Sequence, residues 1–331
     1  MKEIKTVLIA GAGAVGLTVA STIYEWNPKE VYILAKGSSL ENYKTNGLFV
    51  NNVRIPFLLA DAEAAKNESA SNKMECKPDL IIIACKFHHL KEIIQEIKNY
   101  VEKDTLILSL LNGISSEHLI AAEYGKDRIP YALILGTDAQ HRDRHTSFNL
   151  KGTIYFGEKT NPSKNGKAAD ACSENVLRIA DFFERTGISY SIPENMIKKQ
   201  WFKFMVNVGI NQSSAILKLP YGPFQKNGKA FNVPEARELM IDAMKEVIAI
   251  SKPEGVKLTE DDIQEWLDCL DGLTPESCTS MCQDIKAGRK TEVEMFAQTV
   301  IEFGKKYNIP TPVNEVFYKQ IRMLEAESSG R

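Results

Sequence analysis

Cysteine is scarce in this sequence, and no two cysteines are spaced as a C-x-x-C pair. The six among 331 residues are too scattered for a zinc ribbon or a thioredoxin-type dithiol. Cys278 and Cys282 could share a helix face, but no third ligand accompanies them. His141 and His145 have the same spacing, in a charged run typical of a solvated loop. We therefore predict no metal, and we expect idle thiols in a reducing cytoplasm.

An excess of charge of either sign is also absent. The chain has 41 Lys and Arg residues against 43 Asp and Glu residues, a formal net charge of −2. Such a balance provides no global field to hold nucleic acid or an anionic membrane surface. We therefore expect a small-molecule partner rather than nucleic acid or a membrane.

A long apolar run of membrane-spanning character is absent as well. The uncharged stretch at residues 6–23 superficially imitates a signal peptide or a short membrane span, but it contains three glycines and its pattern changes halfway. Thr6–Ala10 is a short β-branched run typical of a buried parallel strand. From Ala14 onward, small and apolar residues are typical of a helix packed on a sheet. We expect a soluble, cytoplasmic protein.

Strand-like and helix-like segments alternate through the first part of the chain. A second apolar run at Val31–Ala35 completes a βαβ unit, and residues 47–60 predict a small antiparallel excursion. The cycle then repeats, which predicts an α/β fold with an N-terminal doubly wound parallel sheet. Further strands are expected at 80–85, 105–111, 129–135, 152–157 and 189–192, and helices at 90–100, 115–124 and 168–186.

Beyond Pro193 strand-like runs nearly vanish and the periodicity is helical. This change predicts a C-terminal all-helical domain, with a boundary near residues 190–195. We divide the chain into domains at 1–192 and 193–331. The helices of the second domain are expected at 195–217, 234–251, 259–270, 275–287, 293–307 and 313–326.

The turn after the first strand is rich in glycine. Gly11-Ala12-Gly13-Ala14-Val15-Gly16 is a G-x-G-x-x-G between a predicted strand and a predicted helix, the context that this motif requires. Its glycines permit a tight turn and a close backbone approach to a pyrophosphate, whose charge the helix N-terminus favours. A glycine turn needed only for packing is the alternative. The surrounding βαβ unit favours dinucleotide binding.

The end of the second strand bears on the choice of dinucleotide. NAD sites usually have Asp or Glu there to hold the ribose hydroxyls, whereas a basic residue suits a 2′-phosphate. Here the chain reads Leu34-Ala35-Lys36-Gly37, with no acid before Glu41. Lys36 as an accidental surface lysine is the alternative. The pattern favours NADP(H).

Two further loops follow the carboxyl ends of predicted strands, where doubly wound sheets bind ligands. One contains Lys86 in Cys85-Lys86-Phe87-His88-His89, and the other contains Asn112 in Leu111-Asn112-Gly113. We regard both as candidates for cofactor binding. Asn-Gly is also an ordinary turn pair.

A polar stripe crosses the apolar helix that opens the second domain. Lys203, Asn207 and Asn211 lie at i, i+4 and i+8, so at about 100° per residue they span an arc of about 80°. A lysine amine flanked by amides can donate a proton to a ketone oxygen as hydride arrives, while the amides hold a hydroxylated substrate. This stripe is our candidate catalytic element.

Four segments together resemble the ketopantoate reductase family. The resemblance covers most of the chain in the family's order, and its two later motifs are the more specific. The segments are the glycine turn, Asn112-Gly113, the helix Trp201-x-Lys203-x-x-x-Asn207-x-x-x-Asn211, and Ser280-Met281-Cys282-Gln283-Asp284-Ile285-x-x-x-Arg289-x-Thr291-Glu292. The resemblance implies a Rossmann-type domain and a helical domain that enclose NADPH and ketopantoate in a cleft.

The resemblance also implies a role for each matching residue. Lys203 is implied as the general acid, with Asn112 near it and the nicotinamide, and Lys36 at the position that binds the 2′-phosphate. The implied reaction is reduction of 2-dehydropantoate to pantoate in pantothenate (vitamin B5) and coenzyme A biosynthesis, and a homodimer is compatible with it. Gly288 predicts a helix end within the last motif. The implied substrate-binding residues are Asn207, Asn211, Ser280 and Glu292.

Two positions depart from the family pattern. The family's further substrate-contacting asparagine, ten residues past the position of Asn211, is Tyr221 here, and a tyrosine reshapes the pocket. The loop that keeps Lys86 ends in His88-His89, where glutamine is commoner. These differences leave reduction of a 2-keto acid intact and leave open which acid is reduced.

Three functions therefore compete. The first is reduction of ketopantoate, and the second is reduction of another branched 2-keto acid. The third is a catalytically silent NADP(H) sensor on the same fold, because fold does not determine function. Retention of Lys203 and of the polar residues around it disfavours the sensor, which needs none of them.

Overall fold

The computed structural model describes residues 2–63, 77–168, 171–226 and 233–329, so Cys76 lies outside the described residues. The chain divides into two compact units, Met1–Ile197 and Lys198–Arg331. No helix within the described ranges is long and apolar enough to cross a membrane.

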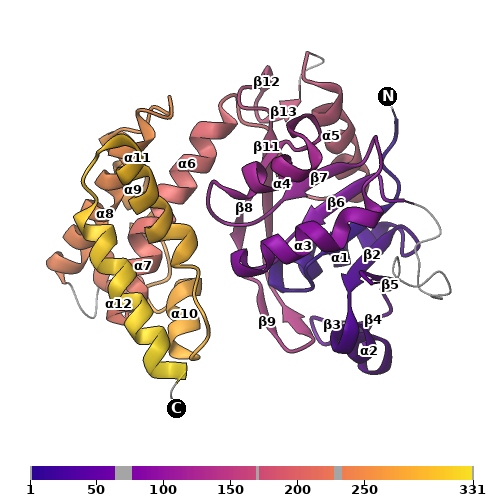
Figure 1. The fold of residues 1–331 in the computed structure, drawn as a ribbon, viewed down its shortest axis with the longest axis horizontal. Coiled ribbons are helices and arrows are strands. Elements are labelled where there is room, and N and C mark those ends of the chain that lie inside the picture. The colour runs from indigo at the N-terminus through magenta and orange to yellow at the C-terminus, as the bar shows by residue number, and fades with distance from the viewer. Residues whose placement is uncertain (1, 64–76, 169–170, 227–232, 330–331) are drawn as a thin grey trace. The chain divides into compact units, whose positions relative to one another are not determined.

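The centre of the N-terminal unit is a five-stranded parallel sheet (Figure 1). Its strands are β1 (Val7–Ala10), β2 (Val31–Ala35), β5 (Leu58–Asp61), β6 (Leu80–Ile83) and β7 (Leu106–Ser109). They are arranged in the order β5-β2-β1-β6-β7, with Val7 paired to Val31 on one side and to Leu80 on the other. The predicted parallel sheet is confirmed.

Alternate residues of the central strands face two separate hydrophobic cores. Val7 and Ile9 share one core with α1 (Ala14–Trp26) and α5 (Glu174–Thr186). Leu8 shares the other with α3 (Leu90–Glu96) and α4 (Ser116–Tyr124), which lie together over one face of the sheet (Figure 1). A sheet covered on both faces needs apolar side chains throughout, which is why these strands have no polar alternation. The unit also contains α2 (Gly37–Asn46) and the 3₁₀ turns η2 (Phe87–His89), η3 (Ile97–Tyr100) and η4 (Lys126–Arg128).

The expected antiparallel excursion exists only in part. β3 (Leu48–Val50) and β4 (Val53–Ile55) form an antiparallel hairpin, with Asn51 and Asn52 at positive φ in its turn. The expectation was wrong for residues 58–60, which belong to β5 and pair in parallel with β2. An open edge of the main sheet offers backbone partners that the short excursion lacks.

The charged run at 141–145, expected as a solvated loop, was also predicted wrongly. It belongs to a hairpin of β9 (Gln140–Arg142) and β10 (His145–Ser147), and β10 pairs in parallel with β3. His141 Nδ1 lies 2.8 Å from Thr146 Oγ1, and the His145 ring stacks on Phe49. Pairing with a strand distant in the sequence outweighs the polar local pattern.

The strand expected at 129–135 forms, but outside the parallel sheet. It is β8 (Tyr131–Thr137), which runs antiparallel to β11 (Lys151–Gly157) with Ile134 opposite Ile154. β11 pairs in turn with β14 (Tyr190–Ser191), and β12 (Ser163–Lys164) and β13 (Lys167–Ala168) form a small hairpin. A continued βαβ cycle had predicted a parallel neighbour for β7. Instead, the β9–β10 excursion returns the chain in the opposite direction, so β8 pairs with β11.

The helix expected at 168–186 begins later, because Ser173 caps it. The Ser173 hydroxyl accepts a hydrogen bond from the N–H of Val176, and the helical residues start at Glu174. Of the expected segment, residues 169 and 170 lie outside the described residues.

The described residues of the C-terminal unit form helices and loops, as predicted. Two of the long segments, 195–217 and 293–307, each contain a π turn, η5 and η7. The helix expected at 275–287 begins only at Ser280, because Thr279 is its N-cap and accepts from the N–H of Cys282. The helical elements are α6 (Met196–Val206), η5 (Asn207–Asn211), α7 (Gln212–Leu217), η6 (Gly222–Phe224), α8 (Pro234–Ser251), α9 (Glu260–Asp271), α10 (Ser280–Lys286), η7 (Glu294–Gln298), α11 (Thr299–Tyr307) and α12 (Pro312–Ser329).

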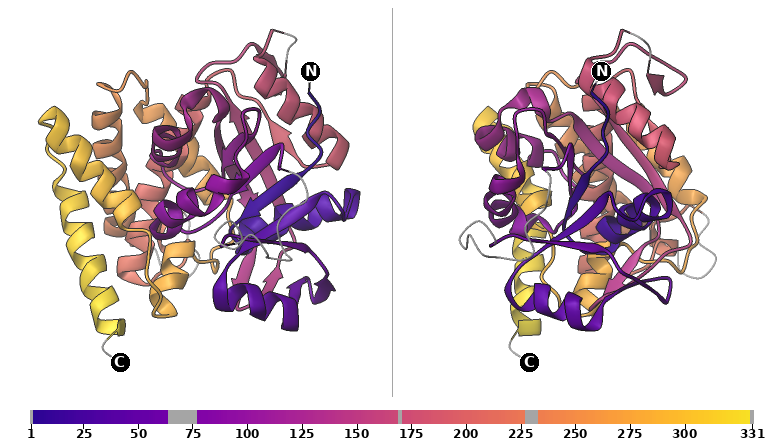
Figure 2. Two further views of the ribbon diagram at one scale, coloured as in Figure 1. Left: turned by 45° about the vertical axis from the view of Figure 1, so that its right-hand side comes forward. Right: turned by 90° about the vertical axis from the view of Figure 1, so that its right-hand side faces the viewer.

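A buried carboxylate joins two long helices of this unit. α12 packs against α8, α7 and η7 (Figure 2). Glu246 of α8 accepts hydrogen bonds from the N–H groups of Val313 (2.7 Å) and Asn314 (3.1 Å) in the first turn of α12. These groups have no partner within their own helix, so the carboxylate satisfies them and favours the positive end of the helix dipole.

Candidate active site

The glycine turn is packed against the end of β6. Gly11 has a φ of +123°, and a Cβ there would lie 2.6 Å from the carbonyl oxygen of Ala84. A Cβ on Gly16 would lie 1.9 Å from the carbonyl oxygen of Gly11. Side chains are therefore excluded at both positions by the backbone itself, as a tight turn requires.

The same turn leaves the beginning of α1 open to an anion. Gly13 is the N-cap of α1 and offers no side-chain cap, and the first turn of the helix has no acidic residue. A Cβ on Gly13 would meet only the carbonyl oxygen of Ala84, at 4.0 Å, so a side chain would fill space that glycine leaves free. Backbone N–H groups at a helix N-terminus bind phosphate groups well. The turn fits a dinucleotide pyrophosphate.

The topology brings the other candidate cofactor residues to this edge. Lys36 follows β2, Lys86 follows β6 and Asn112 follows β7. β2 and β6 run parallel to β1 on either side of it, and β7 lies beyond β6. The carboxyl ends of adjacent parallel strands lie at one edge of the sheet, where doubly wound folds bind their ligands. Lys36, Lys86 and Asn112 therefore gather at the edge that carries the glycine turn.

Lys36 makes contacts that the sequence pattern did not reveal. Its Nζ forms ion pairs with Glu92 and, at 2.6 Å, with Glu96, both on α3. Hydrogen bonds to Glu92 and Glu96 raise the pKa of Lys36 above its usual value. Sequence reasoning missed the two glutamates. Their spacing of four on a predicted helix was the available signal, but nothing local linked that helix to Lys36.

The polar stripe of the C-terminal unit passes through a π turn. Lys203 lies in the last turn of α6, and η5 begins at Asn207 and ends at Asn211. The periodicity predicts a regular α-helix over residues 195–217, and this prediction is wrong at Asn207–Asn211. A step of four residues overshoots an α-helical turn by about 40°. A π turn holds more residues than an α-helical turn, so it changes this offset, and such turns are frequent at functional sites.

Tight packing and a buried amide chain hold this π turn. A Cβ on Gly209 would lie 2.4 Å from Cε of Met244 and 3.0 Å from the carbonyl oxygen of Met240, so η5 approaches α8 closely. Gln212, which is fully buried, donates hydrogen bonds to the carbonyl oxygen of Val208 (2.8 Å) and to Oδ1 of Asn314 (3.0 Å).

The two remaining candidate residues lie on elements packed against this segment. Ser280, which is exposed, begins α10, and α10 contacts both α7 and η5. The N-cap Thr279 donates a hydrogen bond to the Ser214 hydroxyl of α7 at 3.2 Å. Glu292 is 8% exposed and stands just before η7, which contacts η5. As predicted, a helix end separates Ser280 from Glu292, because α10 ends at Lys286.

Comparisons with known proteins agree with this arrangement. Residues 7–161 match the family model described as "Ketopantoate reductase PanE/ApbA", and residues 195–325 match its C-terminal counterpart. The chain belongs to the ketopantoate reductase family. It is therefore an oxidoreductase with a Rossmann-type NAD(P)-binding fold and a small-molecule substrate.

Individual relatives are distant but extend over the whole length. The 2-dehydropantoate 2-reductase of Pyrococcus horikoshii is 26% identical over 98% of this chain and 99% of its own. A structure of D-mandelate dehydrogenase with NADH and anilino(oxo)acetate has a TM-score of 0.83 at 21% identity, and covers 98% of this chain and 99% of that one. A dimeric ketopantoate reductase from Staphylococcus aureus has a TM-score of 0.75 at 19% identity, with coverages of 98% and 99%.

Tyr221, the departure from the family pattern, lies in a buried turn. Its N–H donates to the carbonyl oxygen of Ser277 at 3.0 Å, which ties this turn to the segment before α10. Burial, with Cys278 and Cys269 nearby, raises the pKa of the Tyr221 hydroxyl, so the side chain is neutral near pH 7. A neutral phenol therefore stands where the resemblance implied an amide.

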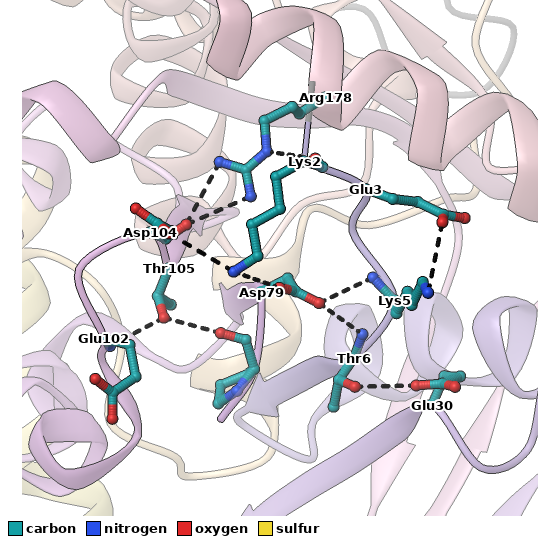
Figure 3. A network of polar contacts seen from close by, with 11 residues as sticks. Lys2, Glu3, Lys5, Thr6, Glu30, Asp79, Glu102, Asp104, Thr105 and Arg178 are labelled. Atoms are coloured by element: carbon teal, nitrogen blue, oxygen red, sulfur yellow. Dashed lines mark hydrogen bonds and ion pairs between the residues drawn. The ribbon is translucent and has the colours of Figure 1, made fainter. Parts of the chain in front are cut away.

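A cavity of about 450 Å³ lies at the opposite edge of the sheet from the glycine turn. It is lined by Lys2, Asp104 and Arg178, among others. Asp79, just before β6, accepts from the N–H groups of Lys5 and Thr6, just before β1 (Figure 3). Ligands of this fold bind at the carboxyl ends of the strands. We therefore interpret this network as structural: it holds the segments that precede β1 and β6 together.

Metal chemistry has no ligand set in the part of the chain that the structure describes. No group of three or more His, Cys, Asp and Glu side chains is assembled there. The family chemistry relies on an organic cofactor instead.

Proposed function

We propose that this protein reduces 2-dehydropantoate to pantoate with NADPH, in pantothenate and coenzyme A biosynthesis. The observation that carries the proposal is the stripe of Lys203, Asn207 and Asn211 through the π turn η5, which packs against the turn that follows Glu292. Family membership and curated relatives named 2-dehydropantoate 2-reductase support it. A sensor would need no such stripe.

In this proposal each unit has its own task. Met1–Ile197 binds the cofactor, and Lys198–Arg331 supplies the catalytic lysine and the substrate contacts. The cofactor, when bound, supplies a hydride to C2 of the keto acid. The cofactor-binding residues are Gly11, Ala12, Gly13, Ala14, Val15, Gly16, Lys36, Lys86 and Asn112.

Lys203 is the proposed general acid. As the C2 carbonyl is reduced, its Nζ donates a proton to the developing alkoxide oxygen, so that the ketone becomes a hydroxyl group. Asn207, Asn211, Ser280 and Glu292 bind the carboxylate and hydroxyl of the substrate. Backbone and side-chain bonds at Thr291 hold the Glu292 segment before any ligand arrives, which lowers the cost of ordering it.

A second candidate is reduction of another branched 2-keto acid. Tyr221 favours it, because an aromatic ring replaces the amide that would hydrogen-bond ketopantoate. Tyr221→Asn restores the family residue. Suppose that ketopantoate is the natural substrate despite Tyr221. The Tyr221→Asn substitution then changes kcat/KM for ketopantoate less than it changes kcat/KM for bulkier or less polar 2-keto acids.

We also propose a homodimer in the cytoplasm. The dimeric relative from Staphylococcus aureus supports the assembly, and the absence of a disulfide among the five described cysteines agrees with a reducing compartment. Light scattering coupled to size exclusion tests the dimer.

The deciding experiment is a steady-state assay with NADPH against a panel of 2-keto acids. The proposal requires ketopantoate to have the highest kcat/KM of the panel. A higher value for 2-ketoisovalerate or another branched acid selects the second candidate. Binding of NADPH without turnover of any member overturns both.

A further inference from the structure

The sequence has no acidic residue at the end of β2, but the fold places two glutamates of α3 beside that strand end. Glu92 and Glu96 are separated from Lys36 by more than fifty residues, yet both carboxylates bind its Nζ. Glu96 is largely buried, with its side chain 14% exposed, while Glu92 is 54% exposed. Lys36 is also the N-cap residue of α2 and has an extended backbone conformation, so its backbone is held at the start of this helix.

This cluster has a different charge from that of a simple phosphate site. One ammonium group and two carboxylates give it a net charge of −1. His89 Nδ1 lies 4.0 Å from Glu92 Oε2 and would add a positive charge only when protonated. A 2′-phosphate, which carries about −1.5 to −2 charges at pH 7, would meet two carboxylates beside Lys36, the cation proposed to hold it. A ribose 2′-hydroxyl, in contrast, can donate a hydrogen bond to a carboxylate, as in NAD sites.

We propose that Glu92 and Glu96 are specificity-determining residues, which restrain the preference for NADPH and allow the protein to use NADH as well. The inference rests on the proposed function only in assigning the cofactor site to this edge of the sheet. Glu96 carries the larger share, because its carboxylate is shielded from water and salt. Glu92 contributes less, as exposed ion pairs do.

The test isolates the 2′-phosphate from the rest of the cofactor. Dissociation constants are measured by calorimetry for 2′,5′-ADP and 5′-AMP, which differ only by that phosphate, and by nicotinamide fluorescence for NADPH and NADH. The variants are Glu92→Gln, Glu96→Gln and the double variant. Glu123→Gln is the matched control, because Glu123 of α4 pairs with Lys98 at 3.6 Å and does not contact Lys36.

We expect the unmodified protein to bind 2′,5′-ADP less than tenfold more tightly than 5′-AMP. Glu92→Gln raises that ratio about two- to fivefold, the range of an exposed pair, and Glu96→Gln raises it further. Glu123→Gln leaves it unchanged. High salt reduces the differences between variants.

Two outcomes overturn the inference. In the first, the unmodified protein binds 2′,5′-ADP more than about a hundredfold more tightly than 5′-AMP, and neither glutamine variant changes that ratio. In the second, neither 2′,5′-ADP nor 5′-AMP binds. Failure of the proposed function looks different. In that case the nucleotide ratios shift as expected, while no 2-keto acid is reduced with either cofactor.

Discussion

One carboxylate oxygen of Glu325 accepts two hydrogen bonds from Thr291, from its N–H at 2.8 Å and from its hydroxyl at 2.7 Å. Glu325 lies on α12 and is almost fully buried, and its other carboxylate oxygen accepts from Arg322 at 2.9 Å. The residue after Thr291 is Glu292. The end of α12 therefore holds the backbone from which a proposed substrate ligand projects.

Glu325→Ala should impair substrate binding without impairing cofactor binding. The variant leaves two buried donors of Thr291 unsatisfied, which costs about 1–3 kcal/mol, and it releases the Glu292 segment. We expect KM for the keto acid to rise while the dissociation constant of NADPH stays the same. Glu325→Gln keeps an acceptor oxygen and should recover much of the loss. A loss of stability with unchanged KM would mean that Glu325 has a purely structural role. Glu315→Ala, at an exposed position of the same helix, is the control.

Lys203→Ala should lower kcat by about 10²–10⁴-fold while the protein stays folded and binds NADPH. The physical reason is the loss of the proton donor to the developing alkoxide. The matched control is Lys199→Ala, one turn earlier on α6, where the ammonium lies 5.3 Å from the Phe202 ring. A lower melting temperature with normal kcat would identify Lys203 as a structural lysine.

Glu292→Ala should collapse the discrimination between ketopantoate and 2-ketoisovalerate. 2-Ketoisovalerate lacks the hydroxymethyl group of ketopantoate, and with it the hydroxyl that the site is proposed to bind. A site built for a hydroxyl rejects an analogue that leaves its buried groups unpaired. We expect the unmodified protein to prefer ketopantoate by a large margin in kcat/KM. Glu294→Ala, a change two residues away at an ion pair with Lys290, should keep that margin. A margin that survives Glu292→Ala removes Glu292 from the substrate site.

Gly209→Ala should destabilise the C-terminal unit and lower kcat. The new Cβ would lie 2.4 Å from the flexible end of Met244 and 3.0 Å from a backbone oxygen of α8, so Met244 or the π turn must move. Overpacking of this kind costs about 1–3 kcal/mol. Gly272→Ala is the control, because its nearest contact would be an ordinary 3.5 Å. Equal melting temperatures for the two variants would show that η5 tolerates a side chain.

The residue pattern was enough to predict the elements whose causes are local. The apolar runs of β1, β2, β6 and β7 predicted buried parallel strands, because a strand covered on both faces needs apolar residues at every position. The G-x-G-x-x-G predicted the turn before α1, since at Gly11 and Gly16 the backbone leaves no room for a Cβ. The spacing of Lys203, Asn207 and Asn211 predicted a polar stripe on one helix.

Relationships between distant segments could not be predicted in this way. The partners of Lys36 on α3, the pairing of β8 with β11 and the hairpin at 140–147 each join segments whose own sequences carry no mark of the other. The π turn at Asn207–Asn211 likewise coincides with close packing of Gly209 on α8 and with the buried bonds of Gln212. Local steric limits and burial depend on residues that are close in the sequence, so the sequence pattern reveals them. The partner of a charged side chain or of a strand edge depends instead on which distant segment the tertiary fold places beside it.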